Sequence, residues 1–224
     1  MLELTDANTV APSPDAVEGL DRDGFLLLTE VLDAATVARL AARLDTLLVD
    51  EGPRAGSEFR DLVPPADRRG ADHLGDLLGK DPLFEQCLTA PRVLGVARVL
   101  LGDRVRLHAM NSRSPRPGDG QQDLHTHLGL CNTLWLLDEM TLDNGPTRVV
   151  PGSHRRSEDD EPERDWRLPY PGERLITAPA GSVLVLDPAV WHGGTVNRLG
   201  GARRVVTTAY SAPDLAPQYA GVRA

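Results

Sequence analysis

The sequence predicts an α+β fold in which helices come first and a series of short strands follows. Residues 33–48 and 91–101 carry apolar side chains at the 3.6-residue spacing of amphipathic helices. From residue 104 onward, short apolar or alternating runs are separated by turn sequences such as 143–146 and 151–153. Helices and strands that are segregated along the chain indicate α+β, and the strands are expected to fold as a sandwich or jelly roll.

The first expected elements lie before residue 50. Residues 1–20 are polar and contain two prolines, so we expect a loose lead-in. The apolar run 24–28 follows three charged residues and predicts a buried strand. Asp33 is placed to cap a helix whose apolar positions run from Val37 to Leu48.

Two further helices are expected before the strands begin. Residues 51–80 show little periodicity and several Gly, Pro and charged residues, which favours a long surface connection. The pair Asp81-Pro82 can open a second helix, because proline at the first helical position loses no hydrogen bond. Pro91 opens a third helix, and Gly102 ends it.

Six short segments of the C-terminal half have the length and texture of strands. One further segment, 155–174, is acidic and contains proline, so it is either a solvated loop or a lid over a site. The expected strands are 104–110, 124–127, 132–137, 147–150, 182–186 and 204–210.

Length and charge limit the class of protein. The 224 residues fit one domain, with a helical part over about 1–102 and a β part over about 103–224. The net charge of −9 disfavours nucleic acid or an anionic membrane surface as the main partner. No apolar run reaches the ~20 residues of a membrane span, and the chain begins without a signal-peptide pattern. Two cysteines in apolar settings are typical of a cytoplasmic protein.

Three histidines form a candidate metal site. His125 and His127 alternate on an expected strand, so both side chains lie on the same face. His192 follows the expected strand 182–186 and a turn, from which it can approach the same point. Imidazole suits iron, zinc, copper and nickel alike, so histidines alone do not name the metal. His73 and His108 are interpreted as structural or surface residues.

Arg203 is a candidate for binding a carboxylate. Its guanidinium offers a fixed fork of donors that matches a carboxylate, and it follows His192 on the next expected strand. Adjacent strand residues face opposite sides, so Arg203 is expected to point inwards and Arg204 outwards. The alternative is that Arg203 is a surface residue like its neighbour.

Several segments, in a fixed order over most of the chain, resemble one enzyme family. The chain is similar to the phytanoyl-CoA dioxygenase-like Fe(II)/2-oxoglutarate oxygenases, which include a group that tailors oligosaccharide antibiotics. The matching segments are Gly24-Phe25…Val31-Leu32, Asn111…Pro117-Gly118…Gln122-Asp123-Leu124-His125, Asp143-Asn144-Gly145-Pro146-Thr147…Pro151-Gly152-Ser153-His154 and Trp191-His192…Asn197…Arg203.

The resemblance implies a fold, cofactors and residue roles. It implies a single oxygenase domain with a double-stranded β-helix (jelly-roll, cupin-like) core, on one sheet of which the N-terminal helices pack. It also implies one Fe(II), with 2-oxoglutarate and O2 as cosubstrates. His125 and His192 match the histidine ligands, and Arg203 matches the residue that holds the distal carboxylate of 2-oxoglutarate. Three further residues fall where the family lines the cosubstrate pocket, namely Gln122, Asn111 and Thr147, whereas His154 matches a scaffold position.

The chain departs from the family at His127. The family pattern is His-x-Asp, and here it reads His125-Thr126-His127. His127 can replace the aspartate and make a three-histidine site, or it can lie outside the coordination sphere. A third possibility is that a segment carrying the aspartate is missing between Thr126 and Cys131, because the loop there is shorter than in relatives. These alternatives stay open at this stage.

The implied activity is oxidation of an unactivated C–H bond in a small-molecule natural product. A sugar-containing substrate is the leading hypothesis, and hydroxylation or oxidative ring closure are possible outcomes. Two other classes are retained. A three-histidine cupin-type metalloenzyme that does not use 2-oxoglutarate would explain His127, and a catalytically inactive binding module would tolerate loss of the aspartate.

Overall fold

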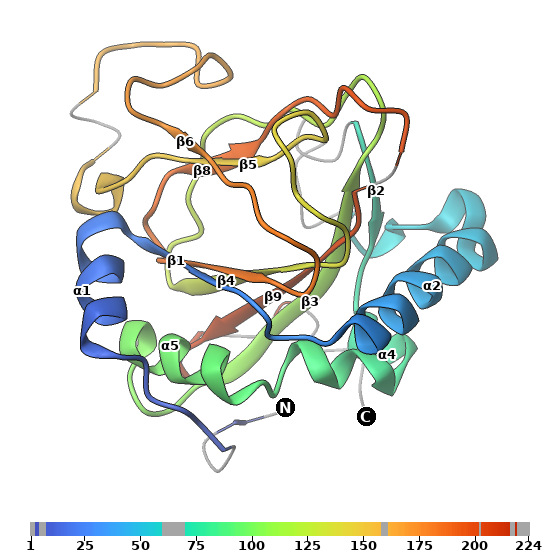
Figure 1. Cartoon of the computed structure of the whole chain (residues 1–224), viewed down its shortest axis with the longest axis horizontal. Helices are drawn as coiled ribbons and strands as arrows, with labels where there is room; N and C mark the ends of the chain where they lie inside the picture. Colours follow the sequence, from blue (N-terminus) through green and yellow to red (C-terminus); the bar gives the residue numbers. More distant parts are fainter. Residues whose placement is uncertain are drawn as a thin grey trace.

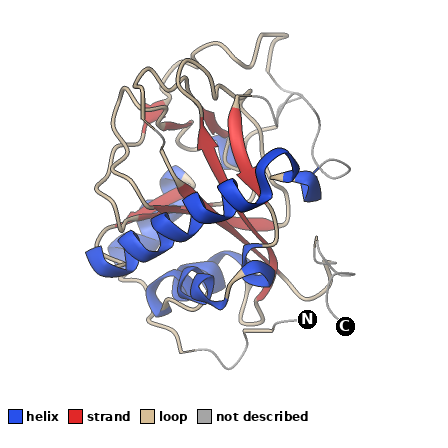
Figure 2. Ribbon diagram, turned by 90° about the vertical axis from the view of Figure 1, so that its right-hand side faces the viewer, coloured by secondary structure: helices blue, strands red, loops and turns tan. Residues whose placement is uncertain are grey.

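The computed structural model of this protein describes residues 3–4, 8–59, 70–157, 161–201, 203–215 and 218. Within them, a six-stranded antiparallel sheet in the order β1-β7-β4-β9-β3-β2 faces a three-stranded sheet in the order β6-β5-β8. The helices cover the face of the larger sheet that points away from the smaller one (Figure 1), and Figure 2 shows the same separation from the side. This arrangement confirms the predicted α+β class and jelly-roll core, with helices packed on one sheet.

The elements follow one another in a simple order. The α-helices are α1 (Pro14–Asp23), α2 (Ala34–Glu51), α4 (Leu77–Lys80) and α5 (Pro91–Leu101), and the 3-10 turns are η1 (Gly52–Arg54), η2 (Ser57–Phe59), η3 (Pro82–Cys87) and η4 (Ser153–Arg155). The strands are β1 (Phe25–Leu28), β2 (Ala71–Leu74), β3 (Arg106–Pro115), β4 (Leu130–Leu136), β5 (Thr147–Val149), β6 (Arg174–Leu175), β7 (Val183–Leu186), β8 (His192–Gly194) and β9 (Val205–Ser211).

The larger sheet has one face toward the helices and one toward the interior of the jelly roll. Side chains alternate along each strand, so Trp135 of β4 and Tyr210 of β9 pack against the helices and are fully buried. Tyr210 also donates a hydrogen bond to the carbonyl of Leu88 (3.0 Å), and Thr208 donates one to Cys87 (2.8 Å). These bonds fix the position of the helical layer on the sheet.

The helices that the sequence predicted most firmly begin and end where expected. Asp33 accepts a hydrogen bond from the Thr36 N–H (2.7 Å) and caps α2, whose residues Leu40 and Leu44 are buried. Gly102 follows α5 with a φ of 88°, a conformation that glycine adopts without strain.

The expectations for residues 1–20 and 51–80 were partly wrong. Residues 14–23 form α1, which Ser13 caps by accepting from the Ala16 N–H at 3.3 Å. Residues 71–74 form the edge strand β2, and residues 77–80 form one helical turn. The last two elements contain four residues each, which is too few to show a period in the sequence. The helix expected at Pro82 is a 3-10 helix, and residues 60–69 lie outside the described part.

Residues 124–127 do not form the expected strand. Only an isolated bridge joins His125 to His192, through two backbone hydrogen bonds of 2.9 and 3.1 Å. The division of the chain near residue 102 is also less clean than expected, because β1 pairs with β7 and β2 with β3. Both cysteines are free and buried. No helix in the described part combines the length and apolar character that crossing a membrane requires.

Candidate metal centre

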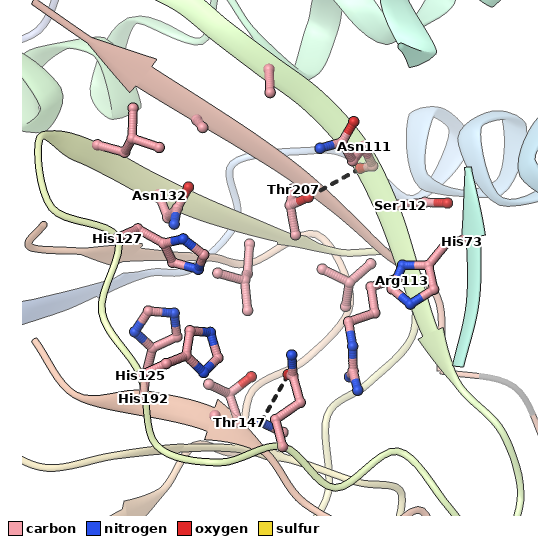
Figure 3. Close-up of a pocket in the computed structure, with 18 of the residues that line it drawn as sticks. His73, Asn111, Ser112, Arg113, His125, His127, Asn132, Thr147, His192 and Thr207 are labelled. Carbon is pink, nitrogen blue, oxygen red and sulfur yellow. Dashed lines mark hydrogen bonds between the residues drawn. The ribbon is translucent and has the colours of Figure 1, made fainter. Parts of the chain in front are cut away.

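Three histidines converge inside the jelly roll, although the segments that carry them differ. His192 begins β8, His125 lies opposite it in the isolated bridge, and the backbone N–H of His127 donates to the carbonyl of Pro188 at 3.1 Å. One ring nitrogen from each histidine lies within 4.8 Å of the other two. Figure 3 shows the three rings side by side at the edge of one pocket.

Backbone contacts determine which nitrogen two of these rings present. The Nδ1 atom of His125 lies 2.8 Å from the carbonyl oxygen of Asp123, and that of His192 lies 2.9 Å from the carbonyl of Val190. A carbonyl oxygen only accepts, so Nδ1 carries the proton in both rings and Nε2 keeps a free lone pair. This is the tautomer in which a histidine binds a metal through Nε2 while a backbone carbonyl orients the ring.

Burial favours the neutral form of two of these histidines, His127 and His192, and the neutral form is the one that binds a metal. Burial, with a smaller contribution from the nearby His125 and His108, lowers the pKa of His127 to about 4. The pKa of His192 is also held well below its usual value, mainly by burial. Within the described residues the group contains three histidines and no carboxylate. The residues present fit a divalent transition metal with nitrogen ligands.

The ring of His127 lies beside those of the other two histidines. Its ring centroid lies 4.9 Å from that of His125 and 5.2 Å from that of His192. A histidine outside the coordination sphere, or one displaced by a missing segment, was expected to lie away from the other two. The three rings are therefore neighbours, and this arrangement requires no strand over 124–127.

The histidines open into a pocket of about 560 Å³ between the two sheets. Arg203 lies in its wall and is buried, with 3% of its surface exposed. Its Nε and Nη1 atoms have no hydrogen-bond partner among the described residues. Burial, followed by the positive charge of Arg113, lowers the pKa of Arg203 to about 9. Arg204 points the other way, as expected, and its guanidinium contacts Asp138 and Asp45.

The other residues that the family resemblance singled out divide into two groups. Three of them line the pocket, namely Gln122, Asn111 and Thr147. Gln122 accepts a hydrogen bond from the Gly194 N–H at 3.1 Å. His154 is not in the pocket lining, and its Nε2 lies 3.0 Å from the carbonyl of Asp21, as expected of a scaffold residue.

Sequence reasoning missed several residues of the pocket wall. His73 of β2 and His108 of β3 were interpreted as structural or surface residues, but both line the pocket. Arg113 and Asn132 line it as well, and Figure 3 shows Asn132 beside His127. The two-residue alternation along β4 could have identified Asn132, because it is a polar residue on the face that Leu130 and Leu134 share.

The acidic segment 155–174 is not a free loop over the part that is described. Arg148 is 1% exposed and donates to three backbone carbonyls, those of Leu168 (2.8 Å), Trp166 (2.5 Å) and Gln122 (2.9 Å). Its Nη1 also lies 3.3 Å from a carboxylate oxygen of Glu173. This segment is therefore tied to the residues that precede His125. Residues 158–160 lie outside the described part.

Comparison with known proteins identifies the family and similar folds. The sequence profile described as phytanoyl-CoA dioxygenase matches residues 20–205. The dioxygenase af480 of Aspergillus fumigatus is 28% identical over 218 residues, which cover 91% of this chain and 68% of that protein.

Two crystal structures have similar folds. HygX from Streptomyces hygroscopicus, with nickel and 2-oxoglutarate bound, has a TM-score of 0.71 at 18% identity and covers 92% of this chain and 90% of its own. HygX is also known with hygromycin B bound. EctD from S. alaskensis with bound Fe has a TM-score of 0.73 at 23% identity, over 95% of this chain and 84% of its own. At these identities the structures support the fold alone.

Proposed function

This chain belongs to the phytanoyl-CoA dioxygenase family, and we propose that it is an Fe(II)- and 2-oxoglutarate-dependent oxygenase whose iron is held by His125, His127 and His192. The family match confirms the predicted dioxygenase class. One observation carries the proposal for the site. A cluster of three histidines shares a pocket with a buried arginine that has two guanidinium nitrogens without a partner among the described residues.

Arg203 is the proposed anchor for 2-oxoglutarate. A buried guanidinium with unpartnered N–H groups is costly unless an anion accepts from it, and a carboxylate matches its geometry. 2-Oxoglutarate carries a carboxylate at each end, so one end can approach the metal while the other reaches Arg203. Thr147, Gln122 and Asn111 line the wall between them in this proposal.

Iron, together with 2-oxoglutarate and O2, would supply the oxidising equivalents that attack a substrate C–H bond. In a hydroxylation, substrate, O2 and 2-oxoglutarate give the alcohol, succinate and CO2, so the alcohol and the succinate each gain one oxygen atom. In an oxidative ring closure the substrate loses two hydrogen atoms, and the second oxygen leaves as water. The protein contributes binding, orientation and exclusion of water. The carbonyls of Asp123 and Val190 orient the ligand rings of His125 and His192.

The proposed substrate is a small-molecule natural product, and a sugar-containing one remains the leading hypothesis. The similar fold of HygX, a protein known with hygromycin B bound, is compatible with this proposal. Nucleic acid and membrane lipid are not proposed as partners, because the chain carries a net charge of −9. A cytoplasmic location is proposed as well, since both cysteines are free thiols.

A three-histidine metalloenzyme that does not use 2-oxoglutarate is the second candidate. It is favoured by one observation, the absence of a carboxylate from the histidine group within the described residues. This candidate gives no role to the buried guanidinium of Arg203, which has two nitrogens without a partner in the described part of the chain. An inactive binding module gives no role to that guanidinium or to the three histidines. The 2-oxoglutarate-dependent enzyme is therefore the function that we propose, ahead of both alternatives.

Anaerobic titration separates the three functions. Fe(II) and 2-oxoglutarate added together should produce a weak visible charge-transfer band that neither produces alone. We expect Arg203→Ala to weaken 2-oxoglutarate binding about 100-fold while metal affinity stays within twofold, because a charge-assisted bidentate contact is worth ~1.5–3 kcal/mol. His192→Ala should lose the metal.

Arg204→Ala is the matched control for Arg203→Ala, because Arg204 is the neighbouring arginine and faces Asp138 outside the pocket. It should keep both the band and the affinity for 2-oxoglutarate. Metal binding without any effect of 2-oxoglutarate would instead support the second candidate. A protein that binds neither iron nor 2-oxoglutarate would be the binding module.

A further inference from the structure

The strand register gives the pocket two ends with different chemistry. Along β9, Arg203 precedes the strand, and the inward-facing positions then run through Val205 and Thr207 to Ala209. The neighbouring strand β3 is antiparallel, so Arg113 lies toward the same end as Arg203 while Ala109 pairs with Ala209. One end of the pocket therefore has two arginines, and the other begins at the paired alanines.

The end with the two arginines is called here the arginine end. Arg113 donates to the carbonyl of Gly120 at 2.7 Å, and the proximity of its charge contributes to the lowered pKa of Arg203. Gly194 also belongs to this end, because a side chain there would meet both the guanidinium of Arg113 and the amide of Gln122. The proposed function places 2-oxoglutarate at this end, where a dicarboxylate meets both positive charges.

The opposite end, called here the uncharged end, has apolar and amide groups. Ala109, Ala209 and Leu130 form its apolar wall, and Asn132 pairs in register with Ala209. Gln218 also lines the pocket, and its backbone N–H donates to the carbonyl of His108 at 3.0 Å. Apart from histidines, the described residues that line the whole pocket include no charged side chain other than the two arginines of the opposite end.

The histidine cluster lines the same pocket, between the two ends. His192 and Gly194 lie two positions apart on β8, which places the cluster next to the arginine end. His127 is close enough to His108 for a charge on one to affect the other, which places it next to the uncharged end. Asn132 points into the pocket beside His127 in Figure 3.

We propose that the primary substrate is an uncharged small molecule that binds at the uncharged end, with hydroxyl or amide groups at Asn132 and an apolar face on Leu130, Ala109 and Ala209. This inference rests on the proposed function, because 2-oxoglutarate must occupy the arginine end. An anionic substrate at the uncharged end would be desolvated without a partner, which costs several kcal/mol. An amide both donates and accepts, so it matches hydroxyl groups of either polarity.

The size of the pocket and the surface charges agree with this substrate class. A pocket of about 560 Å³ lies within the ~300–1,000 Å³ that holds drug-sized ligands, so a compact substrate has room beside 2-oxoglutarate. Three surface arginines of the described part each lie near a carboxylate. Arg116 contacts Asp72 at 2.6 Å and Arg155 contacts Asp21 at 2.7 Å. The Nη1 atom of Arg156 lies 3.8 Å from a carboxylate oxygen of Glu161.

Matched pairs of candidate substrates test the inference. The iron-loaded enzyme with 2-oxoglutarate and O2 would be given methyl glycosides and N-acetylated amino sugars, each beside the uronic acid of the same ring. The measurement is succinate formed above the rate without substrate. We expect the neutral member of a pair to stimulate succinate formation at least ~10-fold more than its carboxylate, because an unpaired buried carboxylate costs more than ~1.4 kcal/mol.

Preferential stimulation by the uronic acids would overturn the inference, and so would the failure of every neutral compound to stimulate. In both cases an intact band with Fe(II) and 2-oxoglutarate would leave the proposed function standing. Absence of that band would overturn the two together.

A variant of Asn132 provides a second test. Asn132→Leu has nearly the same size but no hydrogen-bonding group. We expect the Michaelis constant for the stimulating neutral compound to rise about tenfold, which corresponds to the loss of one hydrogen bond. The Michaelis constant for the cosubstrate, 2-oxoglutarate, should stay within twofold. Equal changes in both constants would indicate general damage and would contradict a role for Asn132 in substrate recognition.

Discussion

The outer faces of the two sheets are covered by different parts of the chain. The larger sheet packs against the helices through a broad apolar core that includes the fully buried residues Trp135, Leu40 and Phe84. The smaller sheet has no helix on it within the described residues. It is supported by the segment 161–173, which a single buried guanidinium, that of Arg148, ties to the protein through backbone carbonyls.

Aromatic side chains complete the support of the smaller sheet. Trp166, Tyr170 and Trp191 have ring centroids 5.3–6.3 Å apart, and the guanidinium of Arg164 lies 4.3 Å from the ring of Tyr170. The candidate metal centre lies on this side, because His192 begins β8 and His125 is bridged to it. We therefore expect the apolar layer under the larger sheet to affect the histidines less than the Arg148 contacts do.

The largest expected effect comes from Arg148→Met. The change removes one donor from each of three backbone carbonyls, of which only that of Trp166 keeps another among the described residues, the Leu124 N–H at 3.0 Å, and an unsatisfied group costs ~1–3 kcal/mol. We expect the free energy of unfolding to fall by about 3 kcal/mol, measured by denaturant titration. Metal affinity of the folded variant should fall about 10-fold or more, because the support of the Gln122 backbone, which precedes His125, is lost.

Leu40→Ala is the matched change in the apolar core beneath the larger sheet. Truncation of a fully buried leucine should lower the unfolding free energy by ~2–5 kcal/mol, a loss similar to that of Arg148→Met. Metal affinity of the folded Leu40→Ala protein should stay within twofold of the parent. If Leu40→Ala weakened metal binding as much as Arg148→Met, the two regions would not be separable.

Substitution of His127 tests whether the site uses three histidines. Loss of one ligand in His127→Ala should weaken Fe(II) binding about 10- to 100-fold, which calorimetry or a competing chelator can measure. His127→Asp supplies a carboxylate and should retain Fe(II) binding, because two histidines and one carboxylate also suit iron. Unchanged affinity in His127→Ala would show that this histidine is not a ligand.

Acid should destabilise the metal-free protein through its buried histidines. Burial lowers the pKa of His73 and of His127 to about 4, whereas both have a pKa of 6.5 when exposed. The unfolded chain therefore binds protons first as the pH falls, and stability is lost between pH 6.5 and 4. The expected slope is on the order of 1 kcal/mol per pH unit for each histidine. Denaturant midpoints measured across this range should fall as the pH falls, and His73→Gln should make that dependence on pH less steep.

The smallest expected effect is at the edge of the larger sheet. Arg116 contacts Asp72 of β2 at 2.6 Å, but the two side chains are 60% and 44% exposed. Arg116→Ala should therefore change the unfolding free energy by less than ~1 kcal/mol, in contrast to the buried arginine of the smaller sheet. A loss comparable to that of Arg148→Met, measured by the same denaturant titration, would contradict this ranking.

Local sequence patterns were sufficient for the long elements and for the main features of the site. The periodic apolar positions of α2 and α5, with Asp33 and Gly102 at their ends, are local signals that burial of one face reinforces. The predicted set of His125, His127, His192 and Arg203 was named from the sequence, through the side-chain types and their spacing together with the family resemblance. The structure brings all four to one pocket.

Only the tertiary structure decided what surrounds these residues. Asn132 and Arg113 lie in the pocket because strands distant in the sequence pair in a specific register, and no local pattern encodes register between β3, β4 and β9. The same is true of Arg148, whose carbonyl partners lie 18 to 26 residues away. A residue type can indicate a possible chemistry, but contacts between distant segments determine which groups share one buried site and which charge each pocket end presents.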